Sequence, residues 1–146
     1  MVTFFLERTT PLPPREAWRR ITRWHHHGAT VPLTRVTVVT PPPSGPGTRI
    51  VARTGLGPIG FDDPMDVTTW RPPDGDRPGL CRLEKRGRLV TGWAELEVRP
   101  APGDRSRVGW REEVEVRGFP SALDGLVARS GRALFGREVD RLLRLP

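Results

Sequence analysis

The chain has 146 residues and a mass of 16.4 kDa, which is the size of one domain, and its formal net charge is +7. Its single cysteine, Cys81, excludes an intramolecular disulfide, and we expect a reducing, cytoplasmic setting. No stretch approaches the roughly 20 apolar residues of a membrane-spanning helix, and the first residues are charged too early for a signal peptide.

The positive charge does not by itself indicate nucleic-acid binding. Arginine supplies nearly all of it, because Lys85 is the only lysine, and 17 prolines and 16 glycines accompany it. This composition is typical of GC-rich coding DNA. The arginines are scattered among acidic residues and do not gather with stacking aromatic side chains. We therefore expect no nucleic-acid partner.

The first elements are a strand and a helix. Residues 3–9 are rich in aromatic and β-branched side chains and predict a strand. Residues 15–24 have helical periodicity, which places Trp18, Ile21 and Trp24 on one apolar face.

The middle of the chain alternates between β-branched runs and turns rich in proline and glycine, which is typical of antiparallel strands. The predicted strands are 33–40, 48–56, 65–71, 80–86, 89–99 and 107–117. We interpret residues 57–64 as a turn-rich loop. The segment from Leu56 to Met65 is a candidate lid that carries Phe61 and Met65, with Asp62 and Asp63 at its tip. A structured turn, in which these aspartates cap backbone amides, is an equal alternative.

Residues 121–145 predict one amphipathic helix of about six to seven turns. Its apolar stripe consists of Leu123, Leu126, Val127, Leu134, Val139 and Leu142. Gly125, Gly131 and Gly136 interrupt the helix. Either these glycines allow close approach to the sheet or leave space for a ligand, or a well-packed helix merely tolerates them.

A long helix that follows antiparallel strands must bury its stripe against the sheet. The sequence therefore predicts one α+β domain over residues 1–146, in which a curved antiparallel sheet of about seven strands wraps around the C-terminal helix. Short helices follow the first strand. A curved sheet that grips one helix often leaves a hollow, so we expect a container between the two layers.

Glu112 is the strongest chemical anomaly of the predicted sheet. Strand alternation places it on the same face as Trp110 and Val114. A carboxylate on an apolar face needs a partner, and it is a candidate polar anchor or general base. The alternative is an ion pair with an arginine, or a bulge that turns Glu112 to solvent.

The histidine triplet is the other polar feature. Consecutive residues of a helix point about 100° apart, so His25, His26 and His27 cannot share one metal ion without ligands from elsewhere, and nothing in the sequence brings Asp62 and Asp63 close to them. We expect no metal and no cofactor, with one histidine inward and two in solvent. Lys85, between Glu84 and the next arginine, is expected in solvent.

The predicted wall of the container combines bulky apolar groups with a few polar ones. Its members are Trp24, His27, Leu56, Phe61, Met65, Trp110, Glu112, Leu126 and Ser130.

The element order resembles the helix-grip fold of the START-like superfamily, which includes polyketide cyclase and dehydrase-like, Bet v 1-like and coenzyme Q-binding proteins. The segments that carry the resemblance are Phe5-Leu6-Glu7-Arg8, Arg15-Glu16-Ala17-Trp18, Trp24-His25-His26-His27-Gly28, Gly47-Thr48-Arg49-Ile50, Val108-Gly109-Trp110-Arg111-Glu112 and the terminal helix. It covers the whole chain and implies a protein that binds hydrophobic molecules. Family members often carry an aspartate after the first helix, where this chain has Arg23 and Trp24.

Three functions follow as hypotheses. The first is binding of a small hydrophobic ligand, such as a lipid, polyketide or isoprenoid-like molecule. The second is a cyclase, dehydratase or aromatase in which Glu112 and either His26 or His27 supply acid–base chemistry. The third is an interaction domain with a filled core, against which a cavity of about 300 Å³ or more would count. The sequence does not decide whether the protein forms a homodimer.

Overall fold

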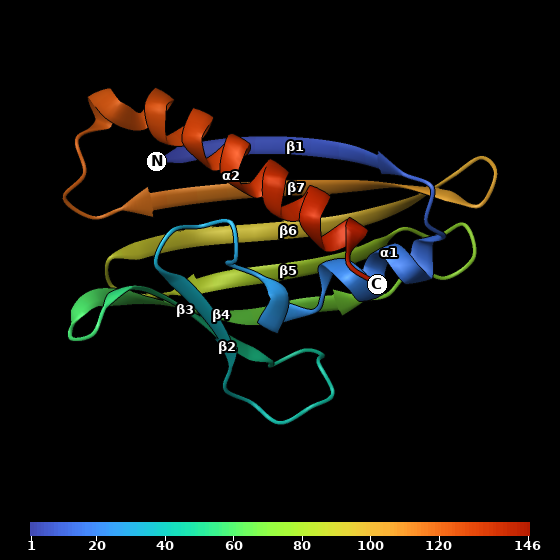
Figure 1. The fold of residues 1–146 in the computed structure, drawn as a ribbon, viewed down its shortest axis with the longest axis horizontal. Coiled ribbons are helices and arrows are strands. Elements are labelled where there is room, and N and C mark those ends of the chain that lie inside the picture. Colours follow the sequence, from blue (N-terminus) through green and yellow to red (C-terminus); the bar gives the residue numbers. More distant parts are fainter.

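Seven antiparallel strands form one curved sheet, and the helices pack on a single face of it (Figure 1). The computed structural model describes residues 1–146. The strands are β1 (Val2–Thr10), β2 (Thr34–Val38), β3 (Arg49–Leu56), β4 (Ile59–Arg71), β5 (Gly79–Arg86), β6 (Val90–Ala101) and β7 (Arg105–Val116). The helical elements are α1 (Pro14–Ile21), η1 (Trp24–His26), η2 (Ser121–Leu123) and α2 (Asp124–Arg144).

The sheet order is β1-β7-β6-β5-β4-β3-β2. The chain leaves edge strand β1, passes through α1 and η1 to the opposite edge at β2, and meanders back until β7 pairs with β1. Helix α2 then crosses the inner face of the sheet diagonally, with β1 as its main neighbour (Figure 1). The predicted helix-grip architecture is confirmed, including the strand number and the long C-terminal helix.

The core lies between the inner face of the sheet and the first helical segment. Trp18 of α1 packs edge-to-face on Trp70 of β4, with ring centroids 5.1 Å apart, and Ile21 is fully buried. Cys81 is also fully buried, and burial raises the pKa of its thiol to about 12. The thiol therefore stays protonated and packs as a small apolar group.

Neither helix combines enough length and apolar character to cross a membrane.

The prediction of a loop over residues 57–64 is wrong, because residues 59–64 belong to β4 and only residues 57–58 form the turn of a long β3–β4 hairpin. β3 and β4 continue in register through the Gly55↔Gly60 and Leu56↔Ile59 pairs. Gly55 has φ +142°, and a Cβ there would lie 2.2 Å from the carbonyl oxygen of Ile59. The glycines thus allow two backbones to meet without side chains, and the sequence signal for a loop is a signal for a tight hairpin.

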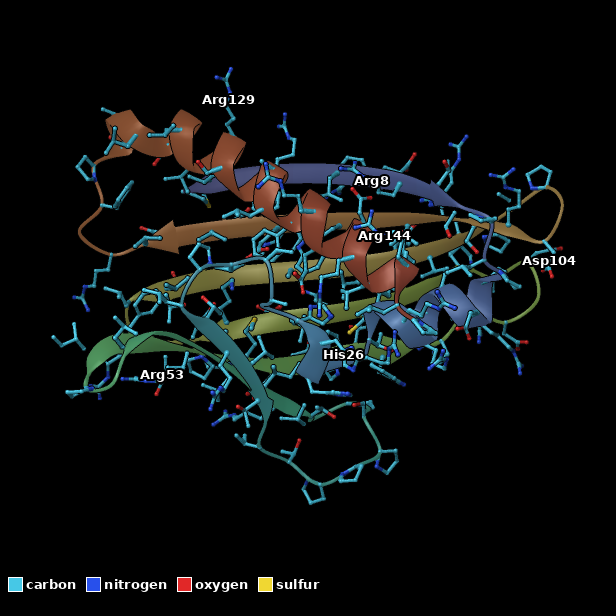
Figure 2. The ribbon with its side chains drawn as sticks, in the orientation of Figure 1. Arg8, His26, Arg53, Asp104, Arg129 and Arg144 are labelled. Atoms are coloured by element: carbon cyan, nitrogen blue, oxygen red, sulfur yellow. The ribbon has the colours of Figure 1, made fainter.

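Arginine side chains are distributed over the molecule. Figure 2 shows Arg8 on β1, Arg53 on β3, and Arg129 and Arg144 at separate turns of α2. Several form exposed ion pairs, such as Arg53 Nη1 with an Asp62 carboxylate oxygen at 3.0 Å. Exposed pairs of this kind contribute about 0–1 kcal/mol each, so they disperse charge and add little stability.

Two of the three glycines of α2 face close neighbours. A Cβ at Gly131 would lie 2.9 Å from the Phe4 ring, and one at Gly136 would lie 2.6 Å from the Arg8 guanidinium. Nothing lies within 4 Å of a Cβ built on Gly125. Close approach to the sheet therefore explains Gly131 and Gly136, and mere tolerance explains Gly125.

Gly131→Ala is expected to destabilise the fold by about 1 kcal/mol. The gain in helix propensity is up to about 1 kcal/mol, but overpacking against a buried aromatic ring costs about 1–3 kcal/mol. Gly125→Ala, in open space, is expected to stabilise by up to about 1 kcal/mol. Urea unfolding of both variants measures the difference, and equal shifts in the same direction would contradict this packing of α2 on β1.

Candidate functional site

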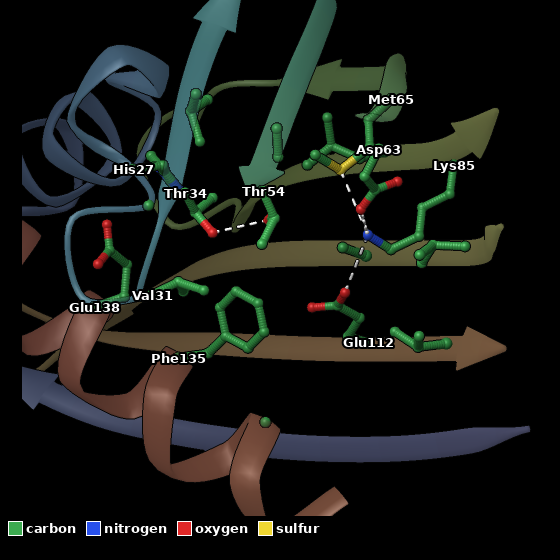
Figure 3. Close-up of a pocket in the computed structure, with 18 of the residues that line it drawn as sticks. His27, Val31, Thr34, Thr54, Asp63, Met65, Lys85, Glu112, Phe135 and Glu138 are labelled. Carbon is green, nitrogen blue, oxygen red and sulfur yellow. Dashed lines mark hydrogen bonds and ion pairs between the residues drawn. The ribbon is translucent and has the colours of Figure 1, made fainter. Parts of the chain in front are cut away.

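A cavity of about 270 Å³ lies between the inner face of the sheet and α2 (Figure 3). All seven strands contribute to its wall, together with α2 and the segment between η1 and β2. Of the 25 residues that line it, 16 are hydrophobic. The cavity is therefore mainly apolar, with a small number of polar side chains.

Aromatic rings form one side of the cavity. The Trp110 ring lies 4.7 Å from that of Phe135 of α2, and the Phe4 ring is stacked on Phe135 at 5.6 Å. The His27 ring adds a tilted contact with Trp110 at 5.9 Å. Stacked and tilted rings present a flat apolar surface, which suits a planar or alicyclic ligand.

Three charged side chains meet at one end of the cavity. Lys85 Nζ lies 2.7 Å from Asp63 Oδ2 and 3.3 Å from Glu112 Oε1 (Figure 3). Trp110 Nε1 donates a hydrogen bond to Glu112 Oε2 at 3.0 Å. The Lys85 and Glu112 side chains are only 6% and 4% exposed. We call Asp63, Lys85 and Glu112 the charged cluster.

Strand parity explains how the charged cluster forms. Cys81, Leu83 and Lys85 alternate along β5 and share its inner face. β6 lies between β5 and β7 and presents two small residues here. Gly92 pairs with Lys85 of β5, and Ala94 pairs with Glu112 of β7. The long lysine side chain therefore reaches across β6 to Glu112.

Lys85 is held in its ammonium form. Burial alone lowers the pKa of this amine, but the Glu112 and Asp63 carboxylates outweigh burial, and the pKa lies above its usual range. A protonated lysine donates hydrogen bonds or a proton and is not a nucleophile. The geometry thus disfavours Schiff-base chemistry and favours a role as donor to a carbonyl or hydroxyl oxygen.

A second polar group faces the cavity from α2. Glu138 is 1% exposed, and its Oε2 accepts hydrogen bonds from the Thr30 hydroxyl at 2.6 Å and the Thr30 amide at 3.2 Å. Glu138 Oε1 is buried without a hydrogen-bond partner, and Arg141 Nη1 lies 3.8 Å from it. Trp24 Nε1, on another wall residue, is also buried without a partner.

His27 lies in the wall beside this group. Its Nε2 is 2.7 Å from the carbonyl oxygen of Ile21, which can only accept, so Nε2 carries the hydrogen and Nδ1 is left as an acceptor. Burial lowers the pKa of the imidazole, although the Ile21 hydrogen bond opposes the change. His27 is therefore neutral at pH 7.

His27→Gln is expected to weaken the acid dependence of stability. A histidine whose pKa is lower in the folded state contributes stability that is present above its ordinary pKa of about 6.5 and is lost as pH falls below it. Urea midpoints at pH 7.5 and about 5.5 measure the slope. His25→Gln, at an exposed position, is the matched control, and an equal slope in both variants would contradict the burial of His27.

The structure brings together most of the predicted wall residues. Those that line the cavity are Trp24, His27, Phe61, Met65, Trp110 and Glu112. Glu112 points inward as predicted by strand alternation, but its partner is Lys85 and not an arginine. Phe61 and Asp63 reach the cavity from β4 and not from a mobile lid.

Four predicted residues lie outside the cavity. Leu56 is 67% exposed, because it follows the distorted Gly55 at the hairpin tip. Leu126 is 61% exposed and Ser130 is also exposed, because the inner face of α2 runs one residue later, through Val127 and Gly131. One residue turns a helical side chain by about 100°.

His26 is the fourth, and it does not join Glu112. Its ring packs edge-on against His25 at 4.3 Å, and its backbone carbonyl accepts a hydrogen bond from Arg141 at 2.7 Å. The structure therefore does not place His26 in the cavity wall with Glu112.

The predicted wall omitted many residues that line the cavity, and the most informative of these are Asp63, Lys85, Phe135 and Glu138. The signal for Lys85 was its parity with Cys81 and Leu83, which outweighs the charge of its sequence neighbours. The signal for the α2 residues was the spacing Gly131, Phe135, Glu138 and Leu142, which follows one helix face. Asp63 gave no usable signal while its segment was assigned to a loop.

No family model and no curated protein sequence matches the chain. Solved structures do match. Norcoclaurine synthase from Thalictrum flavum, in complex with dopamine and hydroxybenzaldehyde, is 13% identical with a TM-score of 0.65, over 97% of this chain and 85% of that one.

Two further structures match over nearly the whole chain. Ara h 8.0201 is 14% identical with a TM-score of 0.61 and covers 98% of both chains. The Zhui aromatase/cyclase from a Streptomyces species is 12% identical with a TM-score of 0.61, over 97% of this chain and 90% of that one. At these identities the comparisons establish the fold, and the chain has the helix-grip fold of Bet v 1-like proteins.

Proposed function

We propose that the protein binds a small hydrophobic molecule in the cavity between the sheet and α2. The observation that carries this proposal is an apolar, aromatic-lined space that closes around a few buried polar groups. Ligand sites commonly combine these two features. The candidate ligands are lipids, polyketides and isoprenoid-like molecules of a size that the cavity accepts.

Burial of apolar surface would drive the binding. A ligand that loses about 200 Å² of apolar surface to the cavity gains about 5 kcal/mol, before the entropy of association is subtracted. The stacked rings of Phe4, Phe135 and Trp110 are already in place, so the ligand does not have to order them. Fold neighbours in complex with small aromatic molecules support the same reading.

The space also weighs against the hypothesis of an interaction domain with a filled core. The volume of about 270 Å³ lies just below the roughly 300 Å³ at which ligand sites begin, so the volume does not decide the question and the lining is the argument. A filled core has no reason to place Lys85, Asp63 and Glu112 around an apolar space, because each buried charge is costly.

Catalysis is the second candidate function, and the charged cluster favours it. A cyclase or dehydratase needs a proton donor and a carboxylate near an apolar substrate, and Lys85 and Glu112 are two such groups. Fold similarity to an aromatase/cyclase supports this candidate. In this version Lys85, and not His26, is the acid.

Glu112→Gln separates the two functions. If the protein is an enzyme of this kind, the variant is expected to lose turnover of a polyketide-like substrate by about 100-fold or more while it retains affinity, because a general base contributes about 10²–10⁴-fold. Intact turnover in the variant would eliminate Glu112 as the base.

Titration with the uncharged fluorophore N-phenylnaphthylamine tests the binding function. We expect a saturable rise in fluorescence with one site per chain, because the dye leaves water for an apolar cavity. A linear, unsaturated response over the micromolar range would contradict the proposal.

A further inference from the structure

We infer that one end of the molecule docks reversibly on the surface of an anionic membrane. This end, which we call the apolar end, consists of the β3–β4 hairpin tip (residues 55–61), the β5–β6 turn (87–89), the segment from the end of β7 into α2 (117–132) and Met1. These parts lie together at the left of Figure 1. The inference goes beyond ligand binding, because it depends on side chains at the surface of the protein.

The hairpin tip carries the most exposed apolar side chain of the apolar end. Leu56 and Ile59 form a cross-strand pair, so they share one face of the sheet, and they are 67% and 81% exposed. The next pair on this inner face is Thr54↔Phe61, and both of its residues line the cavity. Phe61 is also 37% exposed, so it belongs both to the cavity wall and to the surface. The inner face of the hairpin therefore continues past the cavity into solvent.

Other exposed apolar side chains accompany the hairpin tip. They are Met1, Leu89, Phe119, Leu123 and Leu126. With the three of the hairpin, they are eight of the eleven large hydrophobic residues that are exposed in the whole chain. Residues 124–135 of α2 contain no buried side chain, so this half of the helix is free to meet a partner. Exposed apolar residues that gather in this way mark an interaction surface.

The charge of the apolar end favours an anionic partner. Four exposed arginines of this end form no ion pair, namely Arg88, Arg117, Arg129 and Arg132. The aspartates closest to it, Asp62, Asp63 and Asp124, already hold ion pairs. Glu115, near the end of β7, is the nearest carboxylate that holds none. The apolar end therefore carries an excess of three positive charges.

An anionic bilayer satisfies both features at once. Basic side chains are attracted to anionic head groups, while apolar side chains enter the interface between head groups and acyl chains. A second copy of this chain fits less well, because a symmetric contact would bring the excess positive charges together. The bilayer would also meet the cavity wall at Phe61, so a hydrophobic ligand could pass between membrane and cavity without crossing water.

Co-sedimentation with vesicles at about 150 mM salt tests the docking. The wild type is expected to bind vesicles of phosphatidylglycerol and phosphatidylcholine in equal parts at least about tenfold more tightly than vesicles of phosphatidylcholine alone. Leu56→Ser combined with Ile59→Ser should weaken binding to the anionic vesicles at least about tenfold. Val39→Ser is the matched control, because Val39 is also exposed but its amide bonds to Arg49 at the opposite end of β3, and this variant should bind like wild type.

A second set of variants tests the contribution of charge. Arg88→Gln combined with Arg117→Gln should reduce the preference for anionic vesicles at least about tenfold. Arg77→Gln combined with Arg105→Gln, which removes two exposed arginines at the opposite end of the sheet, should leave the preference unchanged.

A fluorescent label reports which end meets the membrane. Cys81 is fully buried, so a maleimide dye reacts only with a cysteine introduced at the surface. A nitrobenzoxadiazole label on Ile59→Cys should brighten when anionic vesicles are added, and the same label on Val39→Cys should not. Equal brightening of the two labels, or equal binding of the wild type to the two kinds of vesicle, would overturn the docking.

The remaining outcomes separate this inference from the binding function. Leu56 and Ile59 are absent from the cavity wall, so titration with N-phenylnaphthylamine in the absence of vesicles tests the cavity independently. Saturable dye binding without vesicle binding overturns the docking alone, and vesicle binding without dye binding overturns the binding function alone. A dimer that ignores vesicles, and that Leu56→Ser with Ile59→Ser abolishes, would make the apolar end a contact between copies of this chain and would overturn the docking.

Discussion

Lys85→Met is expected to lower the free energy of unfolding by about 3–5 kcal/mol at pH 7. The substitution keeps most of the side-chain volume but leaves Asp63 and Glu112 buried without their cation. Removal of one partner from a buried ion pair exposes the other to the full desolvation cost. Urea unfolding measures the loss, and this effect is the largest that we expect from a single polar substitution in the chain.

The stability of the Lys85→Met variant should also depend on pH in a defined direction. The raised pKa of Lys85 means that its contribution in the wild type is fully present below about pH 10.4 and is lost as pH rises through the folded-state value. The variant lacks this contribution at every pH, so its difference from wild type should shrink as pH rises through the folded-state pKa of Lys85.

Two controls make the interpretation specific. Lys85→Met combined with Asp63→Asn and Glu112→Gln should recover most of the loss, because a neutral cluster has no uncompensated charge. Arg53→Met, which removes an exposed ion pair with Asp62, should cost less than about 1 kcal/mol. A loss of that small size for Lys85→Met would mean that the cluster is solvated.

Ala52→Phe is expected to reduce dye binding at least about tenfold, with no loss of the folded state. Ala52 lines the cavity from β3, and a phenyl ring there would occupy space that a ligand needs. Since the added side chain fills an existing void, we expect unchanged or slightly higher stability, in contrast to overpacking of a filled core. Dye titration and thermal unfolding measure the two effects.

Val51→Phe is the matched control for Ala52→Phe. Val51 is the next residue of the same strand, it is absent from the cavity wall, and alternation turns it to the other face of the sheet. This variant should bind the dye like wild type. If both variants bind equally well, the dye sits elsewhere on the protein.

Much of the fold could be predicted because its signals are periodic and local. Strand alternation predicts the inner faces of β6 and β7, and helical periodicity predicts the apolar stripe of the last helix. The stripe must then be buried against the sheet, which fixes how the two layers pack. The inward position of Glu112 came from the same alternation.

The parts that failed depended on information that single segments do not carry. A glycine-rich stretch at residues 57–64 fits a loop or a tight hairpin, and only its register against β3 decides. Lys85 was judged by its charged neighbours, although those side chains lie on the opposite face. Leu126 and Ser130 were placed inward because the apolar stripe was anchored on leucines, while Phe135 and Glu138 define the true inner face.

Native mass spectrometry of freshly purified wild type and Ala52→Phe, prepared side by side, tests the central claim most directly. We expect the wild type to carry a stoichiometric small-molecule adduct, either from the cell or after incubation with fatty acids, quinones and aromatic polyketides. Denaturation should release the adduct, and Ala52→Phe should lack it. Wild-type protein that stays bare throughout, or an adduct that Ala52→Phe retains equally, would contradict a ligand in the cavity between the sheet and α2.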